Sequence, residues 1–105
     1  MEILTGNIQQ WAIDRNLHTA DPMKQVVKLG EEFGELCQGL AKGNMPATVD
    51  AIGDMYVVLT ILALQLNLSV EGCAEMAYNE IKDRKGKMVN GVFVKESDLQ
   101  RVDAT

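Results

Sequence analysis

The segment from Ala47 to Asn67 constrains the fold of this chain more than any other part of the sequence. Its residues follow helical spacing, and from Met55 onward apolar side chains occupy nearly every side of the expected helix. A helix without a polar face has to be covered on most sides, at the centre of a bundle or in an interface between subunits. For a chain of 105 residues we expect both. The sequence therefore predicts a helical bundle that assembles as a homodimer or homotetramer.

Three further helices are expected around this one. The first spans Asn7 to Arg15. The second begins at Asp21-Pro22, where a capping carboxylate precedes a proline at the first helical position, and it ends at Lys42-Gly43. The fourth runs from Val70 to Arg84, after Ser69 as its cap.

The C-terminal part predicts a small β element and a tail. Asn90-Gly91 between two short apolar runs is a strong signal for a tight hairpin turn. Lys95 to Thr105 is polar and is expected to be a frayed, flexible tail. The predicted fold class is all-α, a four-helix-type bundle with a short C-terminal β-hairpin, in one domain over residues 1–105.

Charge and cysteine content narrow the partners and the compartment. The net charge of −5 leaves no broad basic face for a nucleic acid backbone. Cys37 and Cys73 lack metal-ligand spacing, so we expect free thiols in a reducing compartment. The longest apolar run, Met55 to Leu64, is too short to span a bilayer, and the first residues do not read as a signal peptide. A cytoplasmic protein without membrane contact is predicted.

Five carboxylates stand in two clusters within these apolar helices. Glu31, Glu32 and Glu35 are close on one helix face, and Asp50 and Asp54 share a face of the next helix. Since a very short turn joins the two helices, they should run antiparallel and bring the clusters level with each other. Carboxylates at these spacings repel, and a bound Mg²⁺ would compensate that repulsion.

Two glycines and one histidine bear on this acidic region. Gly34 and Gly53 weaken a helix interior, which suggests a close approach of the helices beside the acidic residues. An ordinary solvated acidic face is the simplest alternative. A di-iron bundle needs Glu-x-x-His pairs, but His18, the one histidine, falls in an expected turn and is interpreted as a surface residue.

Three motifs together resemble a known family. They are Glu31-Glu32-x-x-Glu35, Asp50-x-x-Gly53-Asp54 and Asn79-x-x-Lys82-x-Arg84-Lys85-Gly86. In this combination, over residues 22–94, the chain resembles the MazG-like branch of the all-α nucleoside triphosphate pyrophosphohydrolases. The stretch over residues 78–89 looks especially like small, phage-type members.

The resemblance implies a reaction and a metal site. A nucleoside triphosphate, with deoxynucleotides favoured, would be cut between its α and β phosphates to give a monophosphate and pyrophosphate. The implied Mg²⁺ ligands, with Mn²⁺ as a substitute, are Glu32, Glu35 and Asp54. Asp50 departs from the family pattern, but its spacing of four residues from Asp54 makes it a further candidate ligand. Glu31 and Glu32 are the implied catalytic residues, Glu31 as a further ligand or as the base that orients the water. The family commonly has an acidic residue three positions before its aspartate, where this chain has Ala51.

Substrate contacts are expected on two further groups of residues. Asn79, Lys82, Arg84 and Lys85 would donate to phosphate oxygens, although a basic helix C-terminus also complements the helix dipole. Trp11 and Tyr56 are candidates for contacting the base, with burial in the core as the alternative.

Two other functions stay open at this point. A phosphoribosyl-ATP pyrophosphohydrolase shares the acidic helices. A non-catalytic helical module that binds a metal or a nucleotide is favoured by the missing acid at Ala51.

Overall fold

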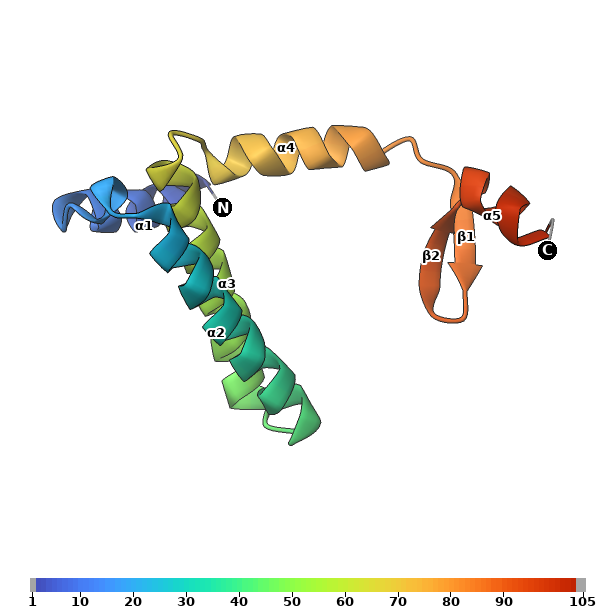
Figure 1. Ribbon diagram of the computed structural model, residues 1–105, viewed down its shortest axis with the longest axis horizontal. Helices are drawn as coiled ribbons and strands as arrows, with labels where there is room; N and C mark the ends of the chain where they lie inside the picture. The colour runs from blue at the N-terminus through green and yellow to red at the C-terminus, as the bar shows by residue number, and fades with distance from the viewer. Residues whose placement is uncertain (1, 104–105) are drawn as a thin grey trace. The chain divides into compact units, whose positions relative to one another are not determined.

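The computed structural model describes residues 2–103 and divides into two compact units, Met1–Glu71 and Gly72–Thr105 (Figure 1). The single-domain organisation stays a prediction. The first unit contains helices α1 (Glu2–Asp14), α2 (Pro22–Ala41) and α3 (Met45–Gln65), with the 3-10 turn η1 (Leu17–Thr19). Helix α4 (Val70–Ile81) begins at the boundary, and strands β1 (Gly86–Val89) and β2 (Val92–Lys95) and helix α5 (Glu96–Asp103) follow it. The predicted helical class and the predicted hairpin are both confirmed.

Helices α2 and α3 form an antiparallel pair whose ends are set by local capping. The Asp21 carboxylate accepts from the Met23 N–H at 3.0 Å at the start of α2, as predicted. The Asn44 side chain accepts from the Ala47 N–H at 3.1 Å, so α3 begins at Met45 rather than at the predicted Ala47. Between the helices Gly43 has a φ of 64°, which glycine adopts without a steric penalty.

The closest approach of α2 and α3 is at Gly39. A Cβ there would lie 2.9 Å from Thr48 Oγ1 and 3.1 Å from the Thr48 backbone nitrogen. The expectation for Gly34 and Gly53 was wrong, because a Cβ at either position meets nothing within 4 Å in the described chain. Both glycines lie on exposed sides of their helices, so a glycine inside an acidic motif did not mark the contact.

Helix α1 and η1 pack on α3 and complete the core of the first unit. Ala12 and Ile61 are buried there, while Thr5 is buried with its hydroxyl hydrogen-bonded to the Tyr56 hydroxyl. Helix α1 begins at Glu2, five residues before the predicted start, and it therefore covers more of α3 than expected.

Among the described residues of the first unit, only one side of α3 is covered. Val58 and Ile61 are buried, whereas Val49 and Ile52 remain more than half exposed. At 21 residues α3 is also long and apolar enough to cross a membrane, although the shorter run considered above is not. A core helix of a soluble protein passes the same test, so this property is weak evidence and the compartment stays a prediction.

The second unit contains the predicted hairpin and an unpredicted helix. Asn90 and Gly91 both have positive φ, 51° and 80°, which is the two-residue turn that matches strand twist. Helix α5 shows that the frayed tail expected from Lys95 was wrong for residues 96–103, while residues 104–105 lie outside the described part. Two acidic residues in the first turn of α5 suit its N-terminus, and the Glu96 N–H donates to the Lys85 carbonyl at 2.8 Å.

Candidate metal centre

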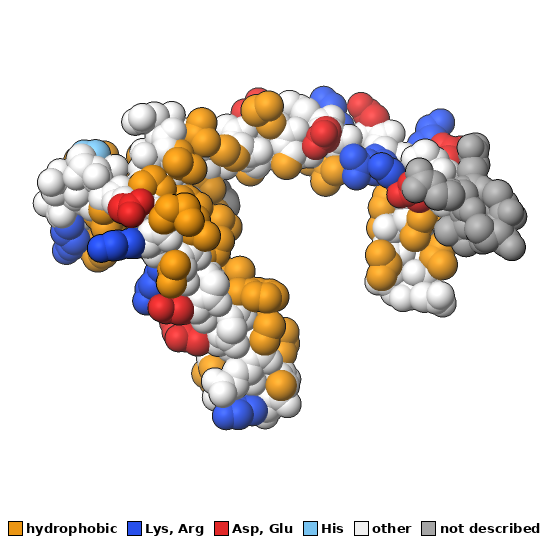
Figure 2. Space-filling view, in the orientation of Figure 1, with side chains coloured by type: hydrophobic (Ala, Val, Ile, Leu, Met, Phe, Trp, Pro, Cys, Tyr) orange, Lys and Arg blue, Asp and Glu red, His pale blue; other side chains and the backbone are white. Residues whose placement is uncertain are grey.

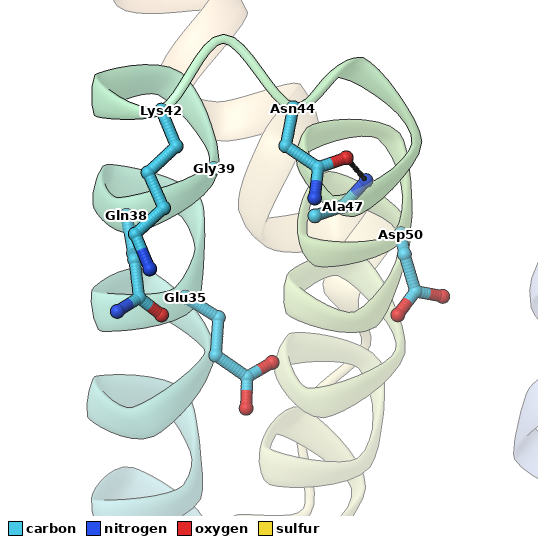
Figure 3. Close-up of a pocket in the computed structure, with 7 residues that line it drawn as sticks. All are labelled: Glu35, Gln38, Gly39, Lys42, Asn44, Ala47 and Asp50. Atoms are coloured by element: carbon cyan, nitrogen blue, oxygen red, sulfur yellow. Dashed lines mark hydrogen bonds between the residues drawn. The ribbon is translucent and has the colours of Figure 1, made fainter.

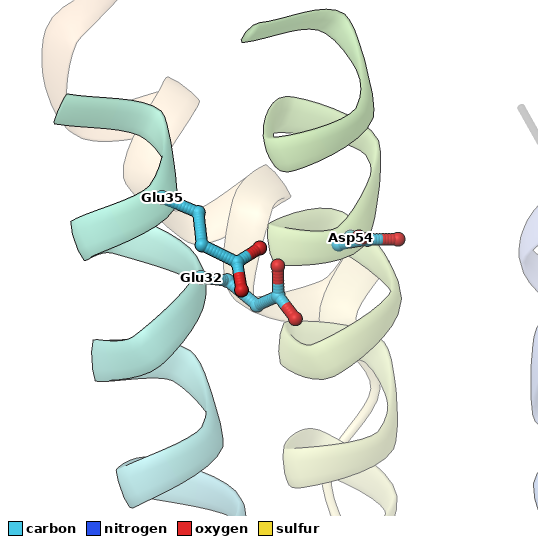
Figure 4. Close-up of side chains that lie close together, drawn as sticks. All are labelled: Glu32, Glu35 and Asp54. Atoms are coloured by element: carbon cyan, nitrogen blue, oxygen red, sulfur yellow. The ribbon is translucent and has the colours of Figure 1, made fainter. Parts of the chain in front are cut away.

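Three carboxylates meet across the α2–α3 pair. Glu32 and Glu35 extend from α2 toward α3, which carries Asp54 (Figure 4). One oxygen from each residue lies within 4.8 Å of the other two. We call these three residues the carboxylate trio. The predicted proximity of the two acidic clusters is confirmed for this trio, because the short turn sets the helices antiparallel and in register.

Glu32 is the buried member of the trio. Its residue is 5% exposed, and one carboxylate oxygen, Oε1, lies 3.5 Å from the ammonium of Lys28. The other oxygen, Oε2, is buried and has no hydrogen-bond partner among the described residues. A buried carboxylate oxygen without a partner is costly, and buried polar atoms are normally paired. Since the Lys28 side chain is itself 55% exposed, solvent weakens its compensation of the Glu32 charge.

Asp54, like Glu32, lies where negative charge is not fully balanced by nearby positive charge. Burial raises the pKa of the Asp54 carboxyl above its usual value, and the negative charges of Asp50 and Glu32 raise this pKa further. Hydrogen bonds that the protonated Asp54 carboxyl donates to Glu32 and Asp50 act in the same direction, whereas ionised Asp54 has no proton to donate to either group. A cation bound between these groups would act in the opposite direction, because it favours the ionised form of each ligand.

The donor set fits a hard divalent cation. Mg²⁺ and Ca²⁺ prefer oxygen ligands, at about 2.1 Å and about 2.4 Å respectively. Two oxygens on opposite sides of one Mg²⁺ are therefore about 4.2 Å apart, and neighbouring ones are closer. The trio oxygens lie within 4.8 Å of one another, so rotation of the exposed Glu35 side chain brings them toward such distances.

The remaining acidic residues of the two motifs lie outside the trio. Glu31 is mostly exposed, and its carboxylate is 4.0 Å from Lys28 Nζ. Asp50 is exposed as well, although its charge acts on Asp54. Ala51 is 1% exposed, so the position where the family commonly has an acid is part of the core. The assignments of Glu31 and Asp50 stay predictions.

A polar pocket of about 330 Å³ adjoins the trio at the α2–α3 turn. Gln38 and Lys42 follow Glu35 along α2, while Asn44 and Asp50 contribute from the α3 side (Figure 3). Sequence reasoning missed Lys42. Lys42 stands seven residues after Glu35, two helical turns along the same face, and this spacing is the sequence signal that would have indicated it.

The two aromatic candidates differ in their surroundings. Trp11 is 47% exposed, and the Arg15 guanidinium lies 4.2 Å from its ring centroid. The Tyr56 hydroxyl is already engaged with Thr5 inside the fold. Trp11 is therefore the more accessible of the two, and both base-binding assignments stay predictions.

The other predicted residues do not belong to the trio. The four phosphate-binding candidates belong to the end of α4 and the residues after it, and all are exposed: Asn79, Lys82, Arg84 and Lys85. Their role stays a prediction. Helix α4 ends at Ile81, three residues before the expected end. His18 lies in η1 and is half-buried, and Cys37 and Cys73 are free and exposed, as expected for the thiols.

Comparison with known proteins identifies a relative, but the description of that relative assigns it no activity. No family model matches the chain, and no solved structure matches it. A protein of Haemophilus phage HP1 (strain HP1c1), described as an uncharacterized 18.2 kDa protein in the rep-hol intergenic region, is 53% identical over 66 residues. The match covers 62% of this chain and 40% of the relative, so the chain spans less than half of that protein's length. The phage source of the relative is consistent with the resemblance to phage-type proteins.

Proposed function

We propose that this chain is a Mg²⁺-dependent nucleotide pyrophosphohydrolase of the MazG-like kind, acting on (deoxy)nucleoside triphosphates. The observation that carries the proposal is the buried, unpartnered Oε2 of Glu32 within a trio of carboxylates from two helices. An acidic surface patch alone would leave its carboxylates solvated. A buried, unpartnered carboxylate oxygen on a residue that converges with two further carboxylates instead supports a cation site.

Glu32, Glu35 and Asp54 are the proposed ligands, because they converge without any movement of the backbone. A bound Mg²⁺ supplies neutralisation of phosphate charge and a lower pKa for the attacking water. Magnesium sites of this kind commonly combine a few protein carboxylates with substrate phosphates, so a set of three carboxylates would suit a nucleotide substrate.

The chain's own side chains then have distinct tasks in the reaction. The exposed carboxylate of Glu31, adjacent to Glu32 in the sequence, is the proposed group that orients the water or accepts its proton, while Glu35 stays a ligand. Lys28 beside Glu32 and Lys42 in the adjoining pocket provide positive charge for the phosphates. A bond forms between the water oxygen and the α-phosphorus, and the bond from this phosphorus to the oxygen bridging to the β-phosphorus breaks. The products are a monophosphate and pyrophosphate.

We also propose that the working form is an oligomer. Val49 and Ile52 on α3 and Phe33 and Leu40 on α2 are all more than half exposed. Figure 2 shows hydrophobic side chains along the α2–α3 pair in the first unit. Contiguous exposed apolar surface of this kind marks an interface, and a second copy with the same surface is the simplest cover.

Product analysis tests the proposed reaction. Each dNTP and NTP, and phosphoribosyl-ATP, is incubated with and without Mg²⁺, and the products are identified. We expect a monophosphate and pyrophosphate only with the metal. Glu35→Gln and Asp54→Asn should abolish turnover, while Asp14→Asn, an exposed acid on α1 that lies outside the trio, should retain it. Turnover within a few-fold of the unmodified chain in both trio variants would refute the site.

The buried Ala51 favours a second candidate, a helical module that binds a metal or nucleotide without cleaving it. This position leaves three convergent carboxylates where a fourth ligand is expected. Tight nucleotide binding with no turnover of any substrate in the panel would establish this alternative.

A further inference from the structure

A cleft in the first unit, separate from the polar pocket at the α2–α3 turn, lies between α1, η1, α2 and α3 and has a volume of about 430 Å³. This size is within the range of small-molecule sites. Its apolar lining includes the exposed ring of Trp11 and the side chains of Val57 and Ile61. Such a lining suits a flat, largely apolar group.

The α2 side of the cleft carries two lysines and leads to the carboxylate trio. Lys24 and Lys28 both line it, together with Asp21, whose carboxylate caps the start of α2. Lys28 Nζ is also 3.5 Å from the Oε1 of Glu32, the buried member of the trio. A single lysine side chain therefore joins the cleft to the candidate metal site. A molecule with an anionic end beside Lys28, on the cation proposed for the trio, and with an apolar end in the cleft matches this order of charges.

The lining of the cleft also includes Gln65, a polar residue with one unpartnered atom. Gln65 donates from Nε2 to the Leu17 carbonyl at 3.0 Å. Because that carbonyl only accepts, the bond fixes which end of the amide faces it. The remaining amide oxygen, Oε1, is buried and has no hydrogen-bond partner among residues 2–103. A hydrogen bond from an N–H or O–H donor would stabilise such an oxygen.

We propose that this cleft binds the base of the nucleotide whose phosphates are held at the carboxylate trio. In this arrangement Trp11 contacts the ring, and Gln65 Oε1 accepts from an N–H on the edge of the base. The assignment rests on the proposed function for the identity of the ligand. It makes Gln65, which no sequence motif indicated, a residue that determines affinity for the base.

Fluorescence of Trp11 tests the proposal without any turnover. Trp11 is the one tryptophan in the chain, so the emission comes from this residue alone. Because Trp11 also borders a smaller apolar pocket with Asn7, Ile8 and Val57, the Ala20→Leu variant is needed to assign a change in emission to the cleft. The full-length protein is titrated with dAMP, dCMP, dGMP and dTMP, which are reaction products and are not cleaved, and with deoxyribose 5-phosphate, which has no base. We expect quenching by at least one of the nucleotides and none by the sugar phosphate.

Two variants locate the binding. Ala20→Leu places a larger side chain at an exposed position in the lining of the cleft and should weaken nucleotide binding at least ten-fold, whereas Ala41→Leu, exposed at the end of α2 and outside the cleft, should not. Gln65→Met should weaken binding about 3- to 10-fold through loss of one hydrogen bond, with folding verified by circular dichroism.

The outcomes separate this proposal from the proposed function. Base-dependent quenching that Ala20→Leu removes, without cleavage of any triphosphate, supports the cleft and refutes the reaction. Metal-dependent cleavage with no change in Trp11 emission, and with an unchanged KM in both Ala20→Leu and Gln65→Met, overturns the cleft assignment and leaves the reaction standing.

Discussion

The contact between Gly39 and Thr48 gives a prediction whose magnitude follows from the structure. In Gly39→Ala the new Cβ would lie 2.9 Å from Thr48 Oγ1 and 3.1 Å from the Thr48 nitrogen, where ordinary contact begins at 3.4 Å. The hydroxyl does not move away easily, because Thr48 is buried and Oγ1 donates to the Asn44 carbonyl at 2.8 Å. The two helices therefore have to separate by a few tenths of an ångström.

This separation has an expected free-energy cost. Overpacking of this kind costs about 1–3 kcal/mol, and alanine in a helix regains up to about 1 kcal/mol over glycine. Gly34→Ala has the same gain in helix propensity, but its new Cβ meets nothing within 4 Å in the described chain, so this variant is a matched control. The difference between the two variants isolates the steric cost and should be about 1–3 kcal/mol, or at least about 4 °C in Tm.

Urea unfolding followed by circular dichroism, at one fixed protein concentration, measures this difference. We expect Gly39→Ala to be the less stable variant and Gly34→Ala to match or exceed the unmodified chain. The separation also displaces Glu35 from Asp54, so Gly39→Ala should lose part of any stabilisation by Mg²⁺. Equal stability of the two variants would show that α2 and α3 do not pack at Gly39 and would refute the geometry of the trio.

Four further predictions concern charge, pH and assembly. Saturating Mn²⁺ at about 100 times its Kd should stabilise the unmodified chain by about 2.7 kcal/mol, and Glu32→Gln should show no such shift in Tm. The raised pKa of Asp54 means that the folded chain favours the protonated form, so its contribution to stability is present below the ordinary value of 3.8 and is lost as pH rises through the folded pKa. In EDTA at pH 7, the free energy of unfolding of Asp54→Asn should therefore be about 0.5 kcal/mol higher than that of the unmodified chain, because like-charge repulsion is removed. Melting temperatures measured over a pH series should show this difference narrowing toward acid pH. Lys42→Ala should raise KM for triphosphates several-fold with kcat less affected, which steady-state kinetics will measure. Sedimentation should show a dimer or tetramer at micromolar concentration that Ile52→Glu disrupts, and a monomeric unmodified chain would contradict the proposed assembly.

Local sequence signals predicted the positions of helices and turns well. Asp21-Pro22, Lys42-Gly43 and Asn90-Gly91 act through capping and backbone conformation within a few residues, and all three stand where the structure begins or ends an element. Helix α5 was missed because its polar composition resembles that of a tail, while its first turn bears acidic residues that suit a helix start.

Contacts between helices were harder to predict than the helices themselves. The acidic spacing indicated that Glu32, Glu35 and Asp54 share facing sides, since a short turn fixes the register of the pair. The sequence did not identify Gly39 as the contact, because a glycine faces a neighbouring helix or solvent according to the exact rotation of the helix. Gln65 was missed for a related reason, since an unpartnered atom depends on packing around η1.

The most direct test of the central claim is the identification of products from dNTPs with and without Mg²⁺, for the unmodified chain and Glu32→Gln. We expect a monophosphate and pyrophosphate from the unmodified chain in the presence of Mg²⁺ only, and no product from Glu32→Gln. Diphosphate with orthophosphate would contradict the proposed cleavage position. Equal turnover by Glu32→Gln would contradict the metal site.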